Sequence, residues 1–390
     1  MALSGGGANS DDMRRHNLST VLGILHHNRR LSRTEITHAS GLARSSVKGL
    51  VAELERVGLC FESEPEANFK SGRPSPTVEP RDDVLSVGVS RDARGLTVGF
   101  ATLGATIVHQ RWVPLERATT SMATADAVAA IIDESRAALP ADALLVGIGA
   151  AVPGFVSGSE HNEVFAASIS WDGEPFAEHL SAATGLDAWV RFDAHLGVTA
   201  ESIWGAGKDR PNVYYLYGGP GGIGSAAIVN GRLLSGNVGM ASSLAHTIVK
   251  PGGRLCVCGS LGCFQAEVRL RDVFPQADAR DASRHGVTPP PVPAEDLRRE
   301  IALTCLGVRA AVLAFDPELI LFDGFLSTLL EAGRADLEAA TTVSAMPRLS
   351  QQVTLGVPAL GSDRLLIGAA DLGFRGLLAD PVGLVARLRD

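Results

Sequence analysis

Apolar residues recur at helical spacing in the first sixty positions of the chain. Two sets of these residues form the inward faces of two amphipathic helices. The first set is Leu18, Val21, Leu22 and Leu25, and the second is Val47, Leu50, Val51 and Leu54. Between them, Ser32 begins a shorter helix, and Glu35 three positions later completes a capping box. We expect this helix to turn Ile36 and Ala39 inward. With a glycine turn before the longer helix at 43–57, the pattern predicts a helix-turn-helix.

From residue 84 the pattern changes to short β-rich runs separated by turns. Strands are expected at 85–90, 96–103, 106–115, 144–152 and 214–217, and helices at 127–138 and 295–314. Strands that alternate with helices indicate an α/β domain. Polar segments predict a disordered tail at 1–12, a wing hairpin and linker at 69–76, and a mobile loop at 277–294.

These patterns divide the chain into a tail at 1–12, a winged helix-turn-helix domain with its linker at 13–80, and an α/β domain at 81–390. The length of 390 residues and an apolar content of 45% suit several buried cores. No apolar run is long enough for a membrane span, and no secretory segment opens the chain, so we expect a cytoplasmic protein without membrane contact. A net charge of −8 argues against broad coating of nucleic acid, although a small DNA-binding module remains compatible with it.

The outward face of the third predicted helix carries cationic and short hydrogen-bonding side chains, which suit phosphates and base edges in a major groove. The expected DNA contacts are Arg33, Arg44, Ser45, Ser46, Lys48 and Arg73. Arg73 stands next to a proline, and a stiff arginine of this kind can enter a minor groove. The alternatives are a solvated helical-bundle surface for the helix and a plain linker for Arg73.

Three of the five cysteines lie close together after a histidine: His246, Cys256, Cys258 and Cys263. Thiolate sulfur and imidazole nitrogen are the ligands that Zn²⁺ prefers in a closed tetrahedral site. The alternative is a pair of disulfides or buried thiols. Cys-Val-Cys is too tight for an internal bridge, and an intracellular chain stays reduced. We therefore expect a structural zinc ion, because four protein ligands leave no open position for water.

The segment from His246 through Cys256-Val-Cys258-Gly259-x-x-Gly262-Cys263 resembles the signature of the ROK family of repressors, open reading frames and sugar kinases. Gly72-Arg73-Pro74 resembles a segment of its regulators, which include xylose and N-acetylglucosamine repressors. The resemblance spans residues 18–375. It implies a two-lobed, actin/hexokinase-like and ribonuclease-H-like domain, with a smaller lobe at about 84–190 plus the C-terminal helix and a larger lobe at about 191–365.

Several motif positions depart from those of the family's kinases. The hairpin at 88–95 lacks the paired glycines that let backbone N–H groups approach ATP phosphates, and two arginines stand there instead. Asp193 matches the catalytic base, which also touches the sugar, but Phe192 replaces an asparagine. Ser243 and Gln265 replace two sugar-binding glutamates. The resemblance thus implies a changed ligand or none.

The expected ligand-binding residues are Asp193, Ser243, His246, Gln265 and Trp171, of which Trp171 either stacks on a sugar face or packs the lobe. We expect a non-enzymatic DNA-binding regulator of transcription, and we favour a repressor. Its partners would be an operator in double-stranded DNA, a sugar or sugar derivative as effector, and a second copy of the chain in a dimer or tetramer. The alternatives are a sugar kinase with a fused DNA-binding head and a dimeric DNA-binding protein without a ligand.

Overall fold

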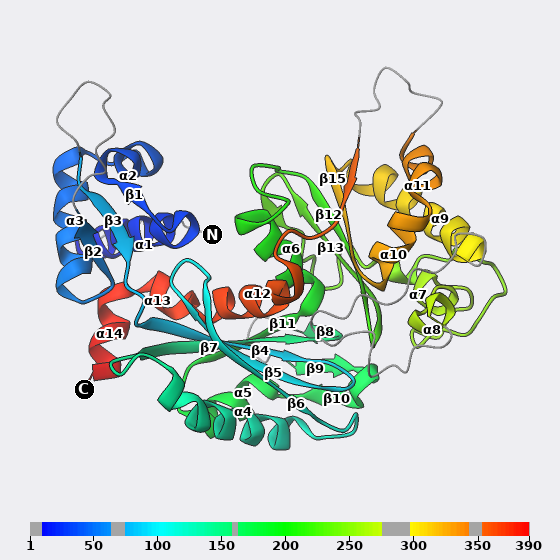
Figure 1. Ribbon diagram of the computed structural model, residues 1–390, viewed down its shortest axis with the longest axis horizontal. Coiled ribbons are helices and arrows are strands. Elements are labelled where there is room, and N and C mark those ends of the chain that lie inside the picture. The colour runs from blue at the N-terminus through cyan, green and yellow to red at the C-terminus, as the bar shows by residue number, and fades with distance from the viewer. Residues whose placement is uncertain (1–9, 64–74, 158–162, 275–296, 343–352, 390) are drawn as a thin grey trace, which may run out of the picture.

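The fold was examined in a computed structural model, which describes residues 10–63, 75–157, 163–274, 297–342 and 353–389 (Figure 1). The N-terminal domain consists of helices α1 (Ser10–Asn28), α2 (Arg33–Ser40) and α3 (Arg44–Arg56) with strands β1 (Leu31–Ser32), β2 (Cys60–Ser63) and β3 (Thr77–Pro80). The strands form one antiparallel sheet in the order β1-β3-β2. Strands β2 and β3 therefore form a wing sheet after the helix-turn-helix, whereas most of the segment at 69–76, expected as a wing hairpin and linker, lies outside the described residues.

Local sequence signals account for the helix boundaries in this domain. The Ser32 hydroxyl accepts the backbone N–H of Glu35 at 3.2 Å, and the Glu35 carboxylate accepts that of Ser32 at 2.7 Å, which confirms the capping box. Two expectations were wrong. Ala39 is exposed, because it lies on the outer side of α2, and α1 already begins at Ser10, so residues 10–12 are helical. Residues 1–9 of the expected tail lie outside the described residues.

The first lobe of the larger domain is built on a five-stranded sheet in the order β11-β7-β4-β5-β6. Its strands are β4 (Val84–Arg91), β5 (Gly95–Thr102), β6 (Ile107–Pro114), β7 (Leu144–Val152) and β11 (Ala188–Phe192). The first three form an antiparallel meander, and β7 and β11 add in parallel. Helices α4 (Ser121–Ser135) and α5 (Phe176–Thr184) pack against each other and share a core with this sheet. A small sheet of β8 (Phe155–Ser157), β9 (Glu163–Ala166) and β10 (Trp171–Glu174) adjoins it.

The second lobe contains another five-stranded sheet, in the order β14-β13-β12-β15-β16. Its strands are β12 (Val213–Gly219), β13 (Gly222–Val229), β14 (Arg232–Leu233), β15 (Leu319–Gly324) and β16 (Thr354–Gly356). Helices α7 (Phe264–Glu267), α8 (Leu270–Val273), α9 (Arg298–Phe315), α10 (Phe325–Ala332) and α11 (Arg334–Thr341) complete the lobe (Figure 1). The loop expected at 277–294 and the Gly72-Arg73-Pro74 segment lie outside the described residues.

Two helices, α6 (Asp193–Trp204) and α12 (Arg364–Gly373), pack against each other between the lobes. Helix α6 contacts the second sheet, and α12 contacts β4 and β7 of the first. This approach is close: a Cβ atom at Gly149 would lie 1.9 Å from the Ala369 carbonyl oxygen. Only glycine therefore fits the strand at that position.

The C-terminal helices α13 (Arg375–Ala379) and α14 (Pro381–Arg389) pack against α1. Leu22 and Leu25 of α1 share a buried cluster with Phe374, Leu377 and Leu384. The N-terminal domain is thus attached to the rest of the chain by a continuous apolar core (Figure 1). No helix within the described part of the chain combines the length and the apolar character needed to cross a membrane.

Candidate functional site

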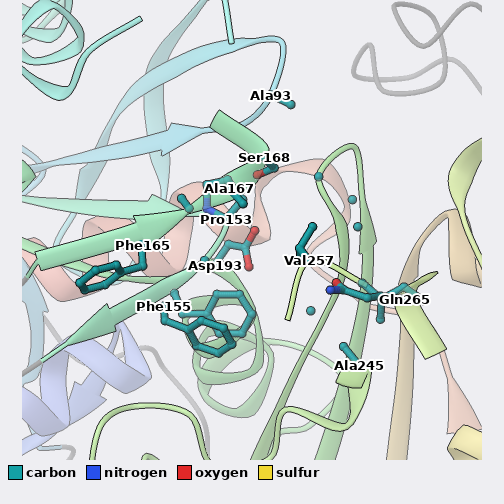
Figure 2. Close-up of a pocket in the computed structure, with 18 of the residues that line it drawn as sticks. Ala93, Pro153, Phe155, Phe165, Ala167, Ser168, Asp193, Ala245, Val257 and Gln265 are labelled. Carbon is teal, nitrogen blue, oxygen red and sulfur yellow. The ribbon is translucent and has the colours of Figure 1, made fainter. Parts of the chain in front are cut away.

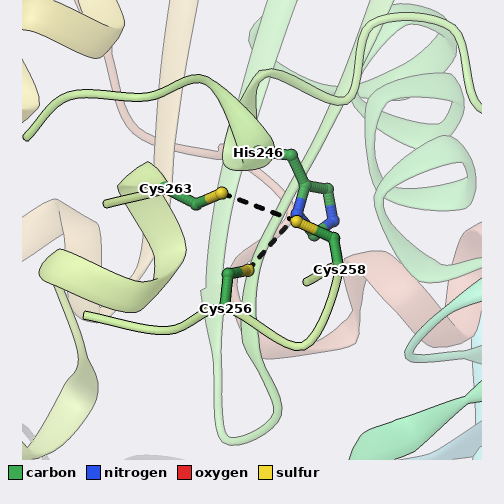
Figure 3. Close-up of side chains that lie close together, drawn as sticks. All are labelled: His246, Cys256, Cys258 and Cys263. Carbon is green, nitrogen blue, oxygen red and sulfur yellow. Dashed lines mark hydrogen bonds between the residues drawn. The ribbon is translucent and has the colours of Figure 1, made fainter. Parts of the chain in front are cut away.

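The four predicted metal ligands converge in space (Figure 3). One nitrogen of His246 and the sulfur atoms of Cys256, Cys258 and Cys263 all lie within 4.8 Å of one another. His246 Nδ1 is 3.5 Å from Cys256 Sγ, and the sulfurs of Cys258 and Cys263 are 3.6 Å apart. Zinc–ligand bonds of about 2.0–2.3 Å in a tetrahedron place neighbouring ligand atoms about 3.5–3.8 Å apart. The arrangement therefore fits a closed zinc site with three sulfurs and one nitrogen.

The loop that carries the cysteines is anchored from two sides. Gly262 has a φ of +83°, and a Cβ there would lie 1.7 Å from the Lys250 carbonyl oxygen, so the loop closes only with glycine. The carboxylate of Glu267, a buried residue of α7, accepts a hydrogen bond from the backbone N–H of Arg254 at 2.5 Å. It also forms an ion pair with Arg299 of α9. The loop that carries the cysteines is thus held against helices α7 and α9 of the second lobe by protein contacts alone, without a metal ion.

Beside the metal ligands lies a cavity of about 630 Å³ between the lobes (Figure 2). All five predicted ligand-binding residues line it, namely Trp171, Asp193, Ser243, His246 and Gln265. Gln265 also donates from Nε2 to Cys256 Sγ at 3.2 Å. His246 and Cys258 therefore belong to both the metal cluster and the cavity wall, and Gln265 joins that wall to Cys256, so a metal ion would fix part of the cavity's shape.

Asp193 is the one buried carboxyl group of the cavity lining, with 8% of its surface exposed. It is the first residue of α6, and its Oδ1 accepts the N–H of Ala194 at 2.6 Å. Burial raises the pKa of Asp193 to about 7, and the nearby carboxylates of Asp323 and Asp92 act in the same direction. Its carboxyl group faces the open cavity beside Phe155 (Figure 2). It is thus placed to bond a ligand.

Sequence reasoning missed most of the aromatic lining. Phe155, Phe165 and Phe192 surround the cavity, and the rings of Phe155 and Phe192 lie 6.1 Å apart between centroids. The sequence did mark Phe192 as a departure, but Phe155 and Phe165 come from the small sheet, for which there was no signal. The Trp171 side chain packs within the lobe at the edge of the cavity. It is 3% exposed, it donates from Nε1 to Thr119 O at 2.9 Å, and its ring lies 4.8 Å from that of Phe176.

The hairpin between β4 and β5 is closed by its own side chains. The Asp92 carboxylate accepts the backbone N–H groups of Arg94 at 2.8 Å and Gly95 at 3.1 Å. Arg91 is buried and donates to the carbonyl oxygens of Gly95 at 3.2 Å and Glu116 at 2.7 Å. The turn's N–H groups are thus already bonded to a carboxylate, which would also repel a phosphate.

A second glycine turn, between β12 and β13, faces a larger cavity of about 1140 Å³. There Asp323 accepts hydrogen bonds from Tyr215 and Arg364, and the Arg364 guanidinium lies 5.5 Å from the centroid of the Tyr217 ring. Asp323 and Arg364 are both buried or nearly so, and they form an ion pair. This arginine is therefore neutralised by protein groups rather than left for a phosphate.

The predicted DNA-binding face is open to solvent. Arg44, Ser45, Ser46 and Lys48 are all exposed, in the first turns of α3, while Val47 between them is buried. Arg33 differs, because its guanidinium forms a two-point ion pair with Glu62 of β2. It therefore braces the wing against α2. Arg73 lies outside the described residues.

Comparison with known proteins adds a family to this geometry. A model of the ROK family matches residues 87–375. The chain is 33% identical to a glucokinase of Streptomyces coelicolor over 181 residues, which are 46% of this chain and 55% of the glucokinase. It is 25% identical to the xylose repressor of Bacillus subtilis over 236 residues, which are 60% of this chain and 61% of the repressor. The chain thus spans little more than half the length of either relative.

One solved structure matches almost the whole chain, including the N-terminal domain. It is a ROK family transcriptional regulator, a homologue of the E. coli MLC protein, with a TM-score of 0.75 and 19% identity. The match covers 96% of this chain and 98% of that one. At this identity the likeness establishes a shared fold.

Proposed function

Because the chain belongs to the ROK family, we propose that it is a DNA-binding transcriptional regulator, a repressor in the first place, controlled by a small molecule in the cleft of Asp193. The exposed polar face of α3 supports DNA binding, since it combines cationic and short hydrogen-bonding side chains at the start of a helix. The cavity beside Asp193 supports an effector site, for a sugar or sugar derivative.

One observation carries this proposal: a single helix runs from the cavity to the N-terminal domain. Helix α6 begins at Asp193 in the cavity wall and ends at Trp204. The Trp204 ring meets two histidines of α1, His26 at 5.3 Å edge-on and His27 at 6.0 Å between centroids. A helix of this length spans about 18 Å. A shift of α6 at the cavity would therefore move the surface on which the DNA-binding domain rests.

The mechanism follows from unequal binding to two arrangements of the lobes. A ligand that contacts Phe155 beside the first lobe and Gln265 on the second, while it bonds Asp193 of α6, favours the closed arrangement. It changes the equilibrium only as far as it binds that arrangement more tightly. In a homodimer, moving the two N-terminal domains relative to each other changes the distance between their recognition helices. Operator affinity changes with that distance, because the two helices must fit two half-sites at a fixed spacing on the duplex. We propose a cytoplasmic dimer, which could pair into a tetramer.

Zinc has a structural role in this proposal. His246, Cys256, Cys258 and Cys263 would hold the ion, and its bonds would supply a rigid link between the ligand loop and the cavity wall. Gln265 supports the assignment, because its amide N–H donates to the Cys256 sulfur, as a group outside the ligand set often does.

The test starts from operators that the full-length protein selects out of a random duplex library. Their affinity is then measured by mobility shift with and without sugars, sugar phosphates and amino sugars that bind the protein in calorimetry. We expect at least one bound compound to change operator affinity about tenfold. A compound that occupies the cleft and leaves operator affinity unaltered would contradict the proposed control, and failure to select any duplex would contradict DNA binding.

A sugar kinase with a fused DNA-binding head is the second candidate, favoured by the position of Asp193 and by the glucokinase relative. The hairpin argues against it, since Asp92 occupies backbone N–H groups that a phosphate would need, and the Arg91 guanidinium is already bonded to backbone carbonyl oxygens. A coupled assay for ADP release across a panel of sugars separates the two candidates. Sugar-dependent turnover of ATP would establish the kinase.

A further inference from the structure

The cavity contains a buried carboxyl group that has no cationic partner among the described residues. Asp193 is more than nine-tenths buried, and its one hydrogen bond within the described chain comes from a backbone N–H to Oδ1. The carboxyl group lines the cavity (Figure 2), and its second oxygen has no hydrogen bond to the described residues. Neighbouring acids differ in this respect, because Asp92 pairs with Arg94 and Asp323 pairs with Arg364. A buried charge without a partner is costly, so this oxygen is set to receive a donor from a ligand.

The surroundings of Asp193 are electronegative. Asp92 lines the same cavity, and both Asp92 and Asp323 act on Asp193 electrostatically, while the opposing charge of Arg364 is paired with Asp323. Arg117, the arginine in the cavity lining, donates to the Ala167 carbonyl at 2.7 Å. A positively charged ligand group next to Asp193 would therefore be attracted by the carboxylates, and few positive charges in the cavity lining would repel it. In a partly dehydrated site such an attraction exceeds that of a neutral hydrogen bond.

The rest of the wall near Asp193 is apolar. Phe155 lines the cavity together with Asp193 (Figure 2), and Phe192, the residue before Asp193 in the chain, adjoins Phe155 with an angle of 33° between the ring planes. Pro153 and Val257 line the cavity from opposite sides. Such surfaces bind the apolar face of a ring and supply few donors or acceptors for a set of hydroxyl groups.

We propose that the effector of this cleft is a cyclic amine, whose protonated amino group pairs with Asp193 while a face of its ring lies against Phe155 and Phe192. An amino sugar is the representative of this class that a cavity of about 630 Å³ readily accommodates. The proposal rests on the effector role given above and names the chemistry of that effector. An uncharged sugar lacks the group that would neutralise Asp193, and an acidic one would be repelled.

Matched ligands test this directly. Calorimetry at neutral pH compares glucose with its 2-amino, 3-amino and 6-amino deoxy analogues and with N-acetylglucosamine, using the full-length protein with its zinc. Each amine replaces one hydroxyl by an ammonium group, and the acetylated sugar keeps the nitrogen without the charge. We expect at least one amine to bind about tenfold or more tightly than glucose and N-acetylglucosamine.

A matched pair of variants locates the effect. Asp193→Asn should lower the affinity of that amine by about tenfold or more, whereas Asp172→Asn removes the same charge from an exposed position on the same cavity and should leave it nearly unaltered. The inference is overturned if glucose or N-acetylglucosamine binds as tightly as every amine, if no amine binds, or if the two variants act alike. Operator binding is measured separately, so a negative result for the amines would not by itself contradict the proposed DNA-binding role.

Discussion

His26 Nε2 lies 2.9 Å from Asp371 Oδ1, so a fully buried imidazole of α1 meets a carboxylate of α12. The other ring nitrogen, Nδ1, accepts the backbone N–H of Gly104 at 3.0 Å. These partners assign the ring proton to Nε2, because Nδ1 must offer a lone pair. The imidazole therefore links the N-terminal domain to the turn after β5 and to the helix between the lobes.

Replacing His26 by leucine should loosen this junction. The variant leaves the Gly104 N–H without its acceptor and Asp371 without its donor, and an unsatisfied buried group costs about 1–3 kcal/mol. We expect a lower melting temperature in thermal unfolding followed by circular dichroism. His38→Leu is the control, because His38 is exposed at the end of α2 and should change stability by less than about 0.5 kcal/mol. Equal effects of the two variants would contradict the role of the junction.

Sequence reasoning succeeded where the cause is local. The capping box of Ser32 and Glu35 involves residues three positions apart, and the four candidate metal ligands fall within one short stretch, so the capping box and the convergence of these side chains could both be predicted. Residue types and spacing also predicted β4, β5, β6 and β7 of the first sheet, since apolar runs of that length between turns have few other structures available, but they did not predict β11.

The unpredicted features depend on contacts between distant parts of the chain. His26 and Asp371 are 345 positions apart, and neither stands in a recognisable motif. The pairing of Asp323 with Arg364 likewise depends on how β15 and α12 meet. Even Arg91, which was noticed as a departure, gave no sign that it would be buried against backbone carbonyls. Such contacts are fixed by tertiary packing, which a single sequence does not reveal.

Zinc content provides a second prediction. Purified protein should contain about one zinc ion per chain. The Cys263→Ser variant should lose the ion and melt at a lower temperature. The Cys305→Ser variant should keep the ion, because Cys305 lies on α9 outside the cluster. His26, His27 and Asp371 also lie within 4.8 Å of one another, but the Nε2 proton of His26 occupies the position a metal would need. Elemental analysis that finds no zinc in wild type, or equal zinc in both variants, would contradict the assignment.

The DNA-binding face provides a third. Arg44→Ala and Lys48→Ala should each weaken binding to a mixed-sequence duplex of about three helical turns several-fold, and should reduce the slope of log affinity against log salt by about one. Arg56→Ala removes an equal charge from the far end of α3 and is the control. Fluorescence anisotropy over a range of salt concentrations measures both quantities. If Arg56→Ala weakens binding as much as Lys48→Ala, the recognition face has been assigned to the wrong end of the helix.

A fourth prediction concerns the pH dependence of stability at Asp193. Burial raises the pKa of its carboxyl group to about 7, against roughly 3.9 for an unfolded aspartate. The groups that face it are Asp92 in the β4–β5 turn, Tyr217 of β12, Asp323 of β15 and Arg364 of α12. The folded chain holds the proton more tightly than the unfolded chain does. The stability from the neutral carboxyl is therefore complete below about pH 4 and is lost as the pH rises towards 7.

Asp193→Asn abolishes that titration and keeps an oxygen to accept the Ala194 N–H. The variant should therefore gain stability relative to wild type as the pH rises, by about 1–3 kcal/mol at about pH 8, with little difference at about pH 4. The shift alone would allow roughly 4 kcal/mol, but the free N–H groups at the start of α6 favour the carboxylate and reduce the gain. Melting temperatures of wild type, Asp193→Asn and the exposed Asp172→Asn across this range decide the matter. A difference between wild type and Asp193→Asn that does not change with pH would mean that Asp193 titrates as an ordinary hydrated carboxylate.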